Sequence, residues 1–288
     1  MAVGLQKPKN IANGYNWLQK GAIRHDTLQN LSLPSSRPTD APEPTPGPNP
    51  TMKKNTANNT KGILIAIEGI DGAGKTTQVE MLCDWLRQTG REVIVTNWYR
   101  TRYIYDLNMK LNLLGEMNCK TAILLVAAEF AGRLEHVIAP ALEQGCVVIA
   151  DKYIYTPFAK DAVRGIDRAL VRKIYEFAAP ADLAFYLKTP VEEALRRIVG
   201  TRKLNYWECG MDLFLGVPVA EGLRMAYGDA IDRRTLEEGF KKFQSQVSDE
   251  YDNMLSRDGM VEIDGTLPAS RQHETIRAHV ERSLGIQS

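Results

Sequence analysis

The chain has 288 residues, of which 44% are apolar and 25% charged, a balance typical of a globular protein that buries a substantial core. Its 36 basic and 35 acidic side chains nearly cancel, which argues against binding to nucleic acid through bulk charge. The longest apolar run, residues 122–128, is far shorter than the roughly 20 residues of a membrane span, so no membrane partner is expected.

Residues 1–60 differ in composition from the rest of the chain. Seven of the fourteen prolines lie between Pro34 and Pro50, and proline disfavours both helix and central strand. We therefore predict a disordered, proline-rich extension over residues 1–60 and a folded domain over residues 61–288. A cytoplasmic location is expected, and import into an organelle through the extension is left open.

Beyond residue 61, short apolar runs alternate with helical patterns. The predicted strands are Ile63–Glu68, Glu92–Thr96, Val147–Ala150, Leu183–Leu187 and Val261–Ile263. The predicted helices are Lys75–Thr89, Thr121–Gln144 with a bend near Pro140, Asp167–Ala178, Val191–Ile198, Leu236–Leu255 and Ala269–Leu284. This alternation predicts an α/β fold in which a parallel sheet of about five strands carries helices on both faces.

The segment between the first strand and the first helix fits the phosphate-binding pattern G-x4-G-K-[ST] at every fixed position. Glycines there turn backbone N–H groups toward phosphate oxygens, and the following helix adds the positive end of its dipole. The predicted nucleotide-binding residues are Gly69, Asp71, Gly72, Ala73, Gly74, Lys75, Thr76 and Thr77. The Lys75 ammonium is expected on the β- and γ-phosphates, and the Thr76 hydroxyl on Mg²⁺.

The stretch Ile67–Gln78 (IEGIDGAGKTTQ) resembles the phosphate-binding loop of thymidylate kinases. Four later segments follow in the order that the family shows: Ala131–Val137 (AGRLEHV), Val148–Tyr153 (VIADKY), Pro180–Ala194 and Ile263–Gly265 (IDG). The resemblance covers residues 61–284, which is most of the predicted folded domain.

This resemblance implies a three-layer sandwich of the P-loop NTPase type with a mobile lid, and a homodimer to which residues 122–128 could contribute. It implies transfer of the γ-phosphoryl group of ATP, with Mg²⁺, to a nucleoside monophosphate. The expected acceptor is dTMP. Asp151, at the end of a predicted strand, is the second expected ligand of Mg²⁺ beside Thr76. The alternative role for Asp151 is a helix cap or a turn.

By the same resemblance, the acceptor is expected to contact Asp71, Arg100, Arg133, Lys152 and Tyr153. Arg102 is the alternative to Arg100, and the alternative for Arg133 is an ion pair with Glu129 one turn earlier. No basic residue lies between Gly69 and Lys75, so the catalytic cation is expected in the lid, which we define as residues 196–212. The expected catalytic residues are Lys75 and Asp71 in the loop and Arg202 and Arg197 in the lid. Of the two lid residues, Arg202 is the first choice.

The chain departs from the family pattern around the acceptor. Lys152 stands where the family has arginine, Glu129 where it often has an aromatic ring, and Lys160 where it favours tyrosine. Acceptance of a different or modified pyrimidine monophosphate is therefore an open alternative. A non-catalytic nucleotide-binding regulator is the second alternative, disfavoured by the intact Lys75, Thr76 and Asp151.

Overall fold

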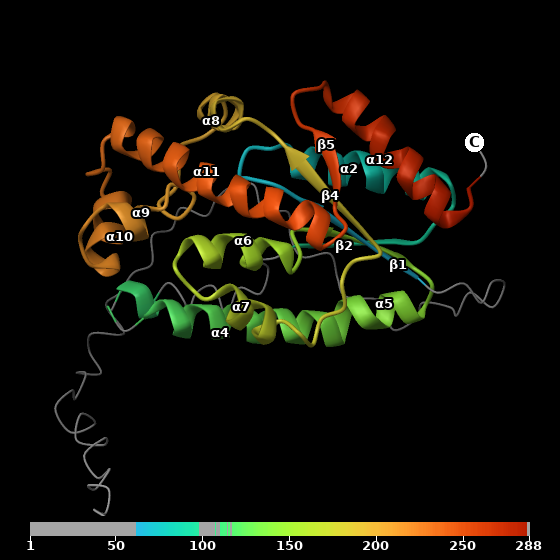
Figure 1. The fold of residues 1–288 in the computed structure, drawn as a ribbon, viewed down its shortest axis with the longest axis horizontal. Helices are drawn as coiled ribbons and strands as arrows, with labels where there is room; N and C mark the ends of the chain where they lie inside the picture. The colour runs from blue at the N-terminus through green and yellow to red at the C-terminus, as the bar shows by residue number, and fades with distance from the viewer. Residues whose placement is uncertain (1–61, 98–106, 108–109, 114, 116, 287–288) are drawn as a thin grey trace, which may run out of the picture. The chain divides into compact units, whose positions relative to one another are not determined.

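The computed structural model describes residues 62–97, 107, 110–113, 115 and 117–286 (Figure 1). The predicted extension over residues 1–60 lies outside the described residues. Arg100 and Arg102 also lie outside them. The strands are β1 (Ile63–Glu68), β2 (Val93–Asn97), β3 (Val147–Asp151), β4 (Leu183–Lys188) and β5 (Val261–Asp264). The helices are α2 (Lys75–Gln88), α4 (Cys119–Arg133), η1 (Leu134–Ile138), α5 (Ala139–Glu143), α6 (Tyr155–Val163), α7 (Arg168–Ile174), α8 (Val191–Val199), α9 (Met211–Phe214), α10 (Val219–Tyr227), α11 (Arg233–Arg257) and α12 (Ala269–Leu284).

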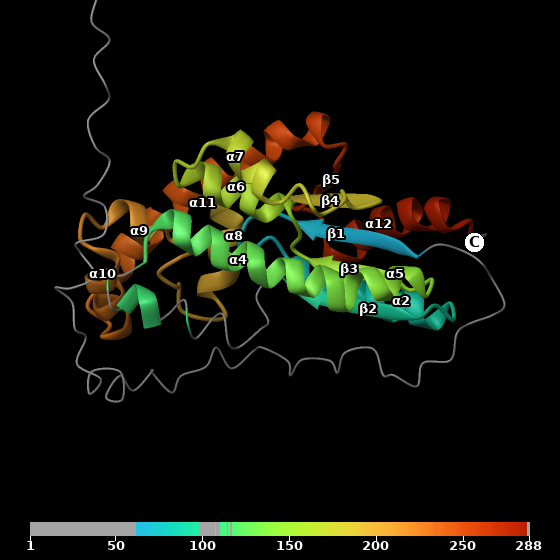
Figure 2. The ribbon, with the colours of Figure 1, turned by 90° about the horizontal axis from the view of Figure 1, so that it is seen from below.

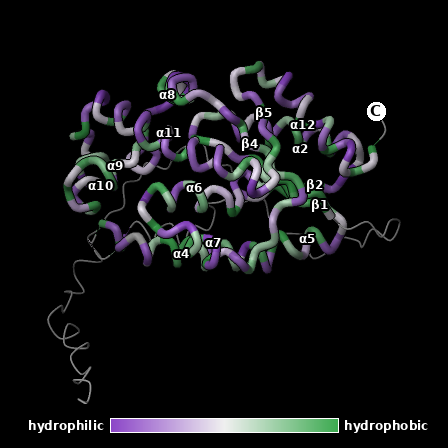
Figure 3. Tube along the Cα trace, viewed as in Figure 1, coloured by the Kyte–Doolittle hydropathy of each residue, from purple (hydrophilic) through white to green (hydrophobic). Residues whose placement is uncertain are grey.

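The five strands form one parallel sheet in the order β2-β3-β1-β4-β5. Every residue of β1 and of β3 is buried, as expected for strands covered on both faces. Helices α2 and α12 lie on one face and the helix from α4 to α5 lies on the other (Figure 1). The central strands β1 and β3 consist mainly of hydrophobic residues. The surrounding helices carry both hydrophobic and hydrophilic residues (Figure 3). The predicted three-layer α/β fold is confirmed.

The sheet order decides where a functional site can form. β1 is the central strand, with β3 on one side of it and β4 on the other. In parallel sheets the loops after the carboxyl ends of such strands line a crevice that binds ligands. The loops that follow β1 and β3 carry most of the predicted site residues.

The helix predicted over Thr121–Gln144 begins at Cys119 and ends at Glu143 as one continuous helix (Figure 2). Asn118 caps it by accepting a hydrogen bond of 3.0 Å from the Thr121 N–H. The expected irregularity near Pro140 is a π-helical turn, Leu134–Ile138, immediately before the proline-containing α5. A widened turn accommodates the proline ring and its missing N–H without ending the helix.

Among the helices whose bounds are given above, α6, α9 and α10 were not predicted. Pro157 lies in the first turn of α6, where a missing N–H costs nothing, although it suppressed the helical signal in the sequence. α9 has only four residues, too few to show periodicity, and α10 contains Gly222. Among the described residues, no helix is both long and apolar enough to cross a membrane.

Candidate active site

The phosphate-binding loop, residues 69–76, joins β1 to α2. Gly69, Gly72 and Gly74 adopt φ values of 145°, 84° and 96°, which L-residues rarely reach. At Gly72 an added Cβ would also lie 2.5 Å from the carbonyl oxygen of Ala194. The glycines of the motif are therefore required by backbone conformation and packing together. α2 begins at Lys75, and its N-cap Gly74 has no side chain to accept from the first N–H groups of the helix, which leaves them for an anion.

Lys75 lies inside the curve of this loop and is 6% exposed. Its Nζ donates hydrogen bonds to the carbonyl oxygens of Gly69 (3.0 Å) and Ile70 (2.6 Å). Burial, together with the nearby Lys152 ammonium, lowers the pKa of Lys75 to about 8, against the opposing charges of Asp71 and Asp151. A desolvated ammonium group at the start of a helix is poised to receive an anion.

Asp151 ends β3 beside the loop. Its Oδ2 accepts hydrogen bonds from Thr76 Oγ1 (3.1 Å) and from Asn97 Nδ2 (3.4 Å). Its Oδ1 is buried and has no hydrogen-bond partner among the described residues. Asn97 ends β2 in register with Asp151 on β3. The sequence analysis did not single out Asn97, which the parallel register of the two strands brings here.

A hydroxyl beside a carboxylate with an unsatisfied buried oxygen is a donor set that suits Mg²⁺, which prefers oxygen ligands. No group of three or more His, Cys, Asp or Glu side chains able to hold a metal occurs in the described part of the chain. A magnesium ion that accompanies a nucleotide needs no such group, since phosphates and water supply most of its ligands. The residues present therefore fit the ion predicted for this position.

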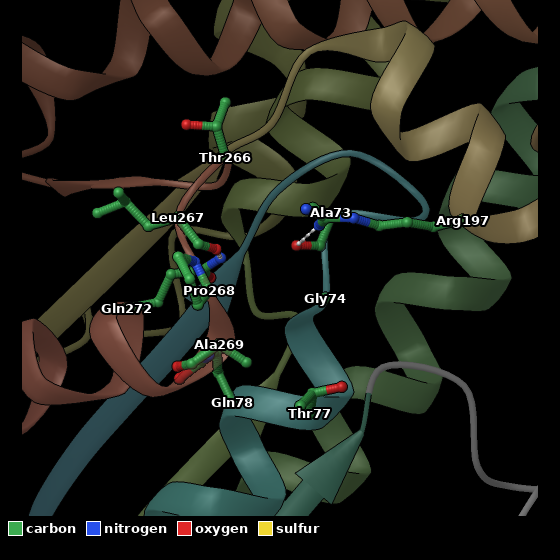
Figure 4. A pocket seen from close by; sticks show the side chains of 10 residues that line it. All are labelled: Ala73, Gly74, Thr77, Gln78, Arg197, Thr266, Leu267, Pro268, Ala269 and Gln272. Atoms are coloured by element: carbon green, nitrogen blue, oxygen red, sulfur yellow. Dashed lines mark hydrogen bonds between the residues drawn. The ribbon is translucent and has the colours of Figure 1, made fainter.

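A cavity of about 390 Å³ opens beside the loop (Figure 4). The start of α2 forms one wall, the segment 266–269 after β5 forms another, and Arg197 of α8 reaches across. Arg197 donates to the carbonyl oxygens of Ala73 (3.3 Å) and Gly265 (2.9 Å), and to Glu193 (2.8 Å). Arg197, expected as a lid cation, thus lies at the wall of this cavity and joins α8 to the loop.

On the other side of the loop, Asp71 is surrounded by cations. Its carboxylate lies 2.6 Å from Lys160 Nζ and 3.6 Å from Lys152 Nζ. Gln244 of α11 donates to Asp71 Oδ2 (3.2 Å) and accepts from the Asp71 N–H (3.2 Å). Burial by itself raises the pKa of Asp71, but Lys160, Lys152 and Lys75 together hold it well below its usual range. The cluster is therefore ionised and carries more positive than negative charge.

Arg133, at the end of α4, points to the carboxyl end of β2. It donates to Glu129 Oε1 (2.9 Å), to Thr96 Oγ1 (3.4 Å) and to the carbonyl oxygen of Asn97. The ion pair with Glu129, the alternative considered for Arg133, is therefore present. The side chains of Arg133 and Glu129 are 9% and 4% exposed, so this ion pair is buried and does not lie at the surface. The structure thus places Arg133 at the edge of the sheet that also holds Asp151.

The lid carries Arg202, the predicted catalytic cation, and two further basic residues, Lys203 and Arg196. Arg202 forms a bidentate ion pair with Glu208, at 2.7 and 2.8 Å. Lys203 lies at the surface beside Asp229, and Arg196 at the surface beside Glu193. Only Arg202 among these is tied to a buried partner, since Glu208 is 3% exposed.

The second half of the lid is packed into the domain. Tyr206, Cys209 and Met211 are 4%, 0% and 2% exposed. Tyr206 packs against Gly222 of α10, where an added Cβ would lie 2.7 Å from the tyrosine hydroxyl. Tyr206 therefore joins this part of the lid to the core at α10.

A family model described as thymidylate kinase matches residues 67–213, from the phosphate-binding loop to α9. The chain belongs to the thymidylate kinase family. It is 35% identical over 210 residues to "Probable thymidylate kinase 2" of Saccharolobus solfataricus, covering 72% of this chain and 90% of that protein. It is 38% identical over 146 residues to "Thymidylate kinase" of Halothermothrix orenii, covering 49% of this chain and 70% of that protein.

In this member of the thymidylate kinase family, the structure departs from the acceptor prediction at one of the described residues, Tyr153. Tyr153 is 1% exposed, and its hydroxyl donates to the carbonyl oxygen of Ala179 (2.9 Å). This core placement is at odds with a side-chain contact to the acceptor. Arg100 lies outside the described residues. Two residues that the sequence did not single out also reach the site: Gln244 contacts Asp71, and Asn97 contacts Asp151.

Proposed function

We propose that this chain transfers the γ-phosphoryl group of ATP to dTMP, giving ADP and dTDP. The observation that carries this proposal is the meeting of a phosphate-binding loop and a cation-lined cluster at one edge of the sheet. This arrangement lies within a domain of the thymidylate kinase family. Phosphoryl transfer requires little covalent chemistry from a protein and depends on position and charge.

The donor side would hold ATP at two places. The β- and γ-phosphates would lie on the loop, where Lys75 and the N–H groups face them. The base would enter the 390 Å³ cavity, where the Arg197 guanidinium is held by three hydrogen bonds and offers a planar face. Thr76 and Asp151 would hold Mg²⁺, which when bound neutralises charge on the phosphates.

The acceptor would lie across the loop tip from ATP. Lys152 and Lys160 would face its anionic and polar groups, Asp71 would accept a hydrogen bond from a hydroxyl, and Arg133 would close the far end. In the transfer, an oxygen of the acceptor phosphate bonds to the γ-phosphorus. The bond from that phosphorus to the β–γ bridging oxygen breaks, and its electron pair leaves with ADP. No general base is needed, because the acceptor phosphate is already ionised at pH 7.

Arg202 would stabilise the transferring group by leaving Glu208 and approaching the phosphates. Its side chain is 43% exposed and sits on the part of the lid that is not packed into the core. Closing a cation over the site would also exclude water and prevent hydrolysis of ATP.

A second acceptor class is favoured by one observation. The acceptor cluster presents two ammonium groups and a carboxylate. Such groups can bind the polar edge of another pyrimidine base, or a ribose hydroxyl, as readily as they bind thymine. We therefore include other pyrimidine monophosphates, deoxy and ribo, as weaker substrates of the same reaction.

A coupled assay of ADP release tests the proposal against a panel of nucleoside and deoxynucleoside monophosphates. We expect ADP release that depends on dTMP, is abolished by chelating Mg²⁺, and is lost in Lys75→Ala. ADP release that no monophosphate stimulates would contradict the proposal and favour a nucleotide-binding regulator.

The homodimer and the cytoplasmic location stay predictions. On α4, the helix that was expected to contribute to the dimer, Leu124 is 58% exposed whereas Ile123 and Ala127 are buried.

A further inference from the structure

Glu68 is a fully buried carboxylate at the boundary between β1 and the phosphate-binding loop. Its Oε1 accepts a hydrogen bond of 2.6 Å from the Tyr153 N–H. Its Oε2 accepts hydrogen bonds of 2.8 Å each from the Thr156 and Tyr251 hydroxyls. The three donors belong to the turn after β3, the first turn of α6 and α11. One carboxylate thus ties three segments to the residue that precedes Gly69.

The turn held by Glu68 has a strained backbone. Lys152 adopts φ of 72°, the left-handed region, and it is not a glycine. Both peptide groups that flank Lys152 are fixed to β1, since the Lys152 N–H donates to the Ile67 carbonyl oxygen (3.2 Å) and the Tyr153 N–H donates to Glu68. Such a conformation persists only where surrounding contacts enforce it.

The direction of two side chains depends on this conformation. Asp151, before the left-handed residue, faces Thr76 of the phosphate-binding loop (3.1 Å). Lys152 itself reaches the opposite side of the loop and lies 3.6 Å from Asp71. Were the turn to relax to an ordinary right-handed or extended conformation, the Lys152 side chain would leave the Asp71 cluster.

We propose that Glu68 is a positioning residue for the acceptor side of the site. By accepting the Tyr153 N–H it holds the turn after β3 left-handed, and so sets where the Lys152 ammonium meets Asp71. The assignment rests on the proposed function, which places the acceptor at that cluster. Glu68 touches no substrate in this scheme; it acts through Lys152.

The environment of Glu68 also identifies a conservative control. Burial raises the pKa of Glu68 to about 7, against hydrogen bonds from Tyr153, Tyr251 and Thr156 that lower it. We therefore take a neutral side chain of the same shape as the conservative variant. Glutamine keeps an oxygen for the Tyr153 N–H, and the hydroxyls of Thr156 and Tyr251 can turn to accept from its amide.

The test measures binding of dTMP by calorimetry, without ATP or metal, to the wild-type protein, Glu68→Ala and Glu68→Gln. We expect Glu68→Ala to weaken dTMP binding by about tenfold or more and ATP binding in the presence of Mg²⁺ by less than about twofold, with Glu68→Gln near wild type for both. Tyr251→Phe is the matched control, because it removes a donor to Oε2 and leaves the turn intact. We expect it to bind dTMP as the wild type does. Equal losses for dTMP and ATP in Glu68→Ala, or loss of dTMP binding in Tyr251→Phe, would overturn the assignment.

A second comparison isolates the backbone effect. Glycine adopts the left-handed conformation without strain, so Lys152→Gly makes the hold of Glu68 on the turn unnecessary. We expect Lys152→Gly and the Glu68→Ala/Lys152→Gly double variant to bind dTMP equally. A further loss in the double variant would overturn the assignment.

If Glu68→Ala does not fold, the variant Glu68→Leu/Thr156→Val/Tyr251→Phe replaces the three polar side chains by apolar ones of similar shape. Of the groups bonded to Glu68, it leaves the Tyr153 N–H without an acceptor, at a cost of about 1–3 kcal/mol. We expect it to fold and to bind dTMP as weakly as stated for Glu68→Ala; wild-type affinity would overturn the assignment. Should another monophosphate of the panel bind the wild-type protein in place of dTMP, the proposed substrate is wrong and the same ratios are measured with that ligand. If no monophosphate binds, both proposals fall.

Discussion

The proposed donor side of the site is built from backbone: three glycines in unusual conformations, and one lysine that donates hydrogen bonds to two carbonyl oxygens of the same loop. The proposed acceptor side consists of side chains from four places, namely the loop, the turn after β3, α6 and α11. A backbone cradle is specified by a short run of sequence and binds any nucleotide phosphate. A side-chain cluster is specified by distant residues and can change its ligand when one of them changes.

The electrostatics of the two sides differ in the same way. Lys75 faces carbonyl oxygens and has a pKa lowered to about 8, chiefly by burial. Asp71, by contrast, has its pKa held low by the ammonium groups of Lys160, Lys152 and Lys75. The acceptor side therefore carries charges that are already paired, and an incoming ligand must compete with those pairs. Selectivity would then depend on how well the ligand replaces them.

The largest effect is expected on the donor side. Lys75→Ala removes the cation that neutralises the transferring group, so turnover should fall by at least about 10³-fold with the fold intact. Steady-state kinetics and circular dichroism measure the two quantities, and Lys241→Ala, on an exposed position of α11, is the control. Turnover near that of the wild type would remove the loop from the mechanism and end the comparison of the two sides.

The next effect concerns Glu68, which lies between the two sides. Because its pKa is about 7 in the folded chain and 4.5 in the reference state, the folded chain binds more protons between these values. The contribution of Glu68 to stability is therefore complete below pH 4.5 and is lost as pH rises to about 7. The difference corresponds to about 3 kcal/mol of unfolding free energy.

Urea unfolding at pH 5 and pH 8 measures this contribution. The wild-type protein should lose more stability than Glu68→Gln across that interval, because glutamine does not titrate. Glu80→Gln, at an exposed position of α2, serves as the control for removal of a carboxylate. Parallel pH profiles for the wild type and Glu68→Gln would show that the carboxylate is not held as described.

A smaller effect is expected from changing the acceptor cluster. Lys152→Arg together with Lys160→Tyr replaces two point charges by a planar fork and an aromatic ring. A polar group left unpaired costs about 1–3 kcal/mol, so selectivity for dTMP over ribonucleotides should rise by about 5- to 150-fold. The ratio of kcat/KM values for dTMP and UMP measures it. The idea fails if the unmodified protein already prefers dTMP by several orders of magnitude, or if the double variant has an unchanged acceptor profile.

The smallest effect is expected from deleting residues 1–60. This segment is poor in apolar residues and rich in proline, so we expect kcat and the midpoint of thermal unfolding to stay nearly unchanged. Kinetics and thermal unfolding of the truncated chain test this. A large loss of either would show that one side of the site is incomplete without the extension and that the domain boundary near residue 61 is wrong.

Much of the fold was predictable because its signals are local. β1 and α12 have the predicted bounds, and the other predicted strands differ by one or two residues. Apolar runs and helical periodicity are properties of adjacent residues. α6 was not predicted because Pro157 disfavours a helix in the local sequence. The buried face of α6 packs into the domain, and this packing stabilises the helix.

The sequence by itself determined the phosphate-binding loop, since its glycines, lysine and threonine are contiguous and each is required by backbone geometry or charge. It also determined the parallel sheet that carries this loop. Only the tertiary structure decided that Asn97 joins Asp151, that Gln244 and Lys160 meet Asp71, that Tyr153 belongs to the core, and that Glu68 holds a left-handed turn. These contacts join residues up to 173 positions apart, and no periodicity or spacing in a single chain encodes which distant side chains a sheet edge brings together.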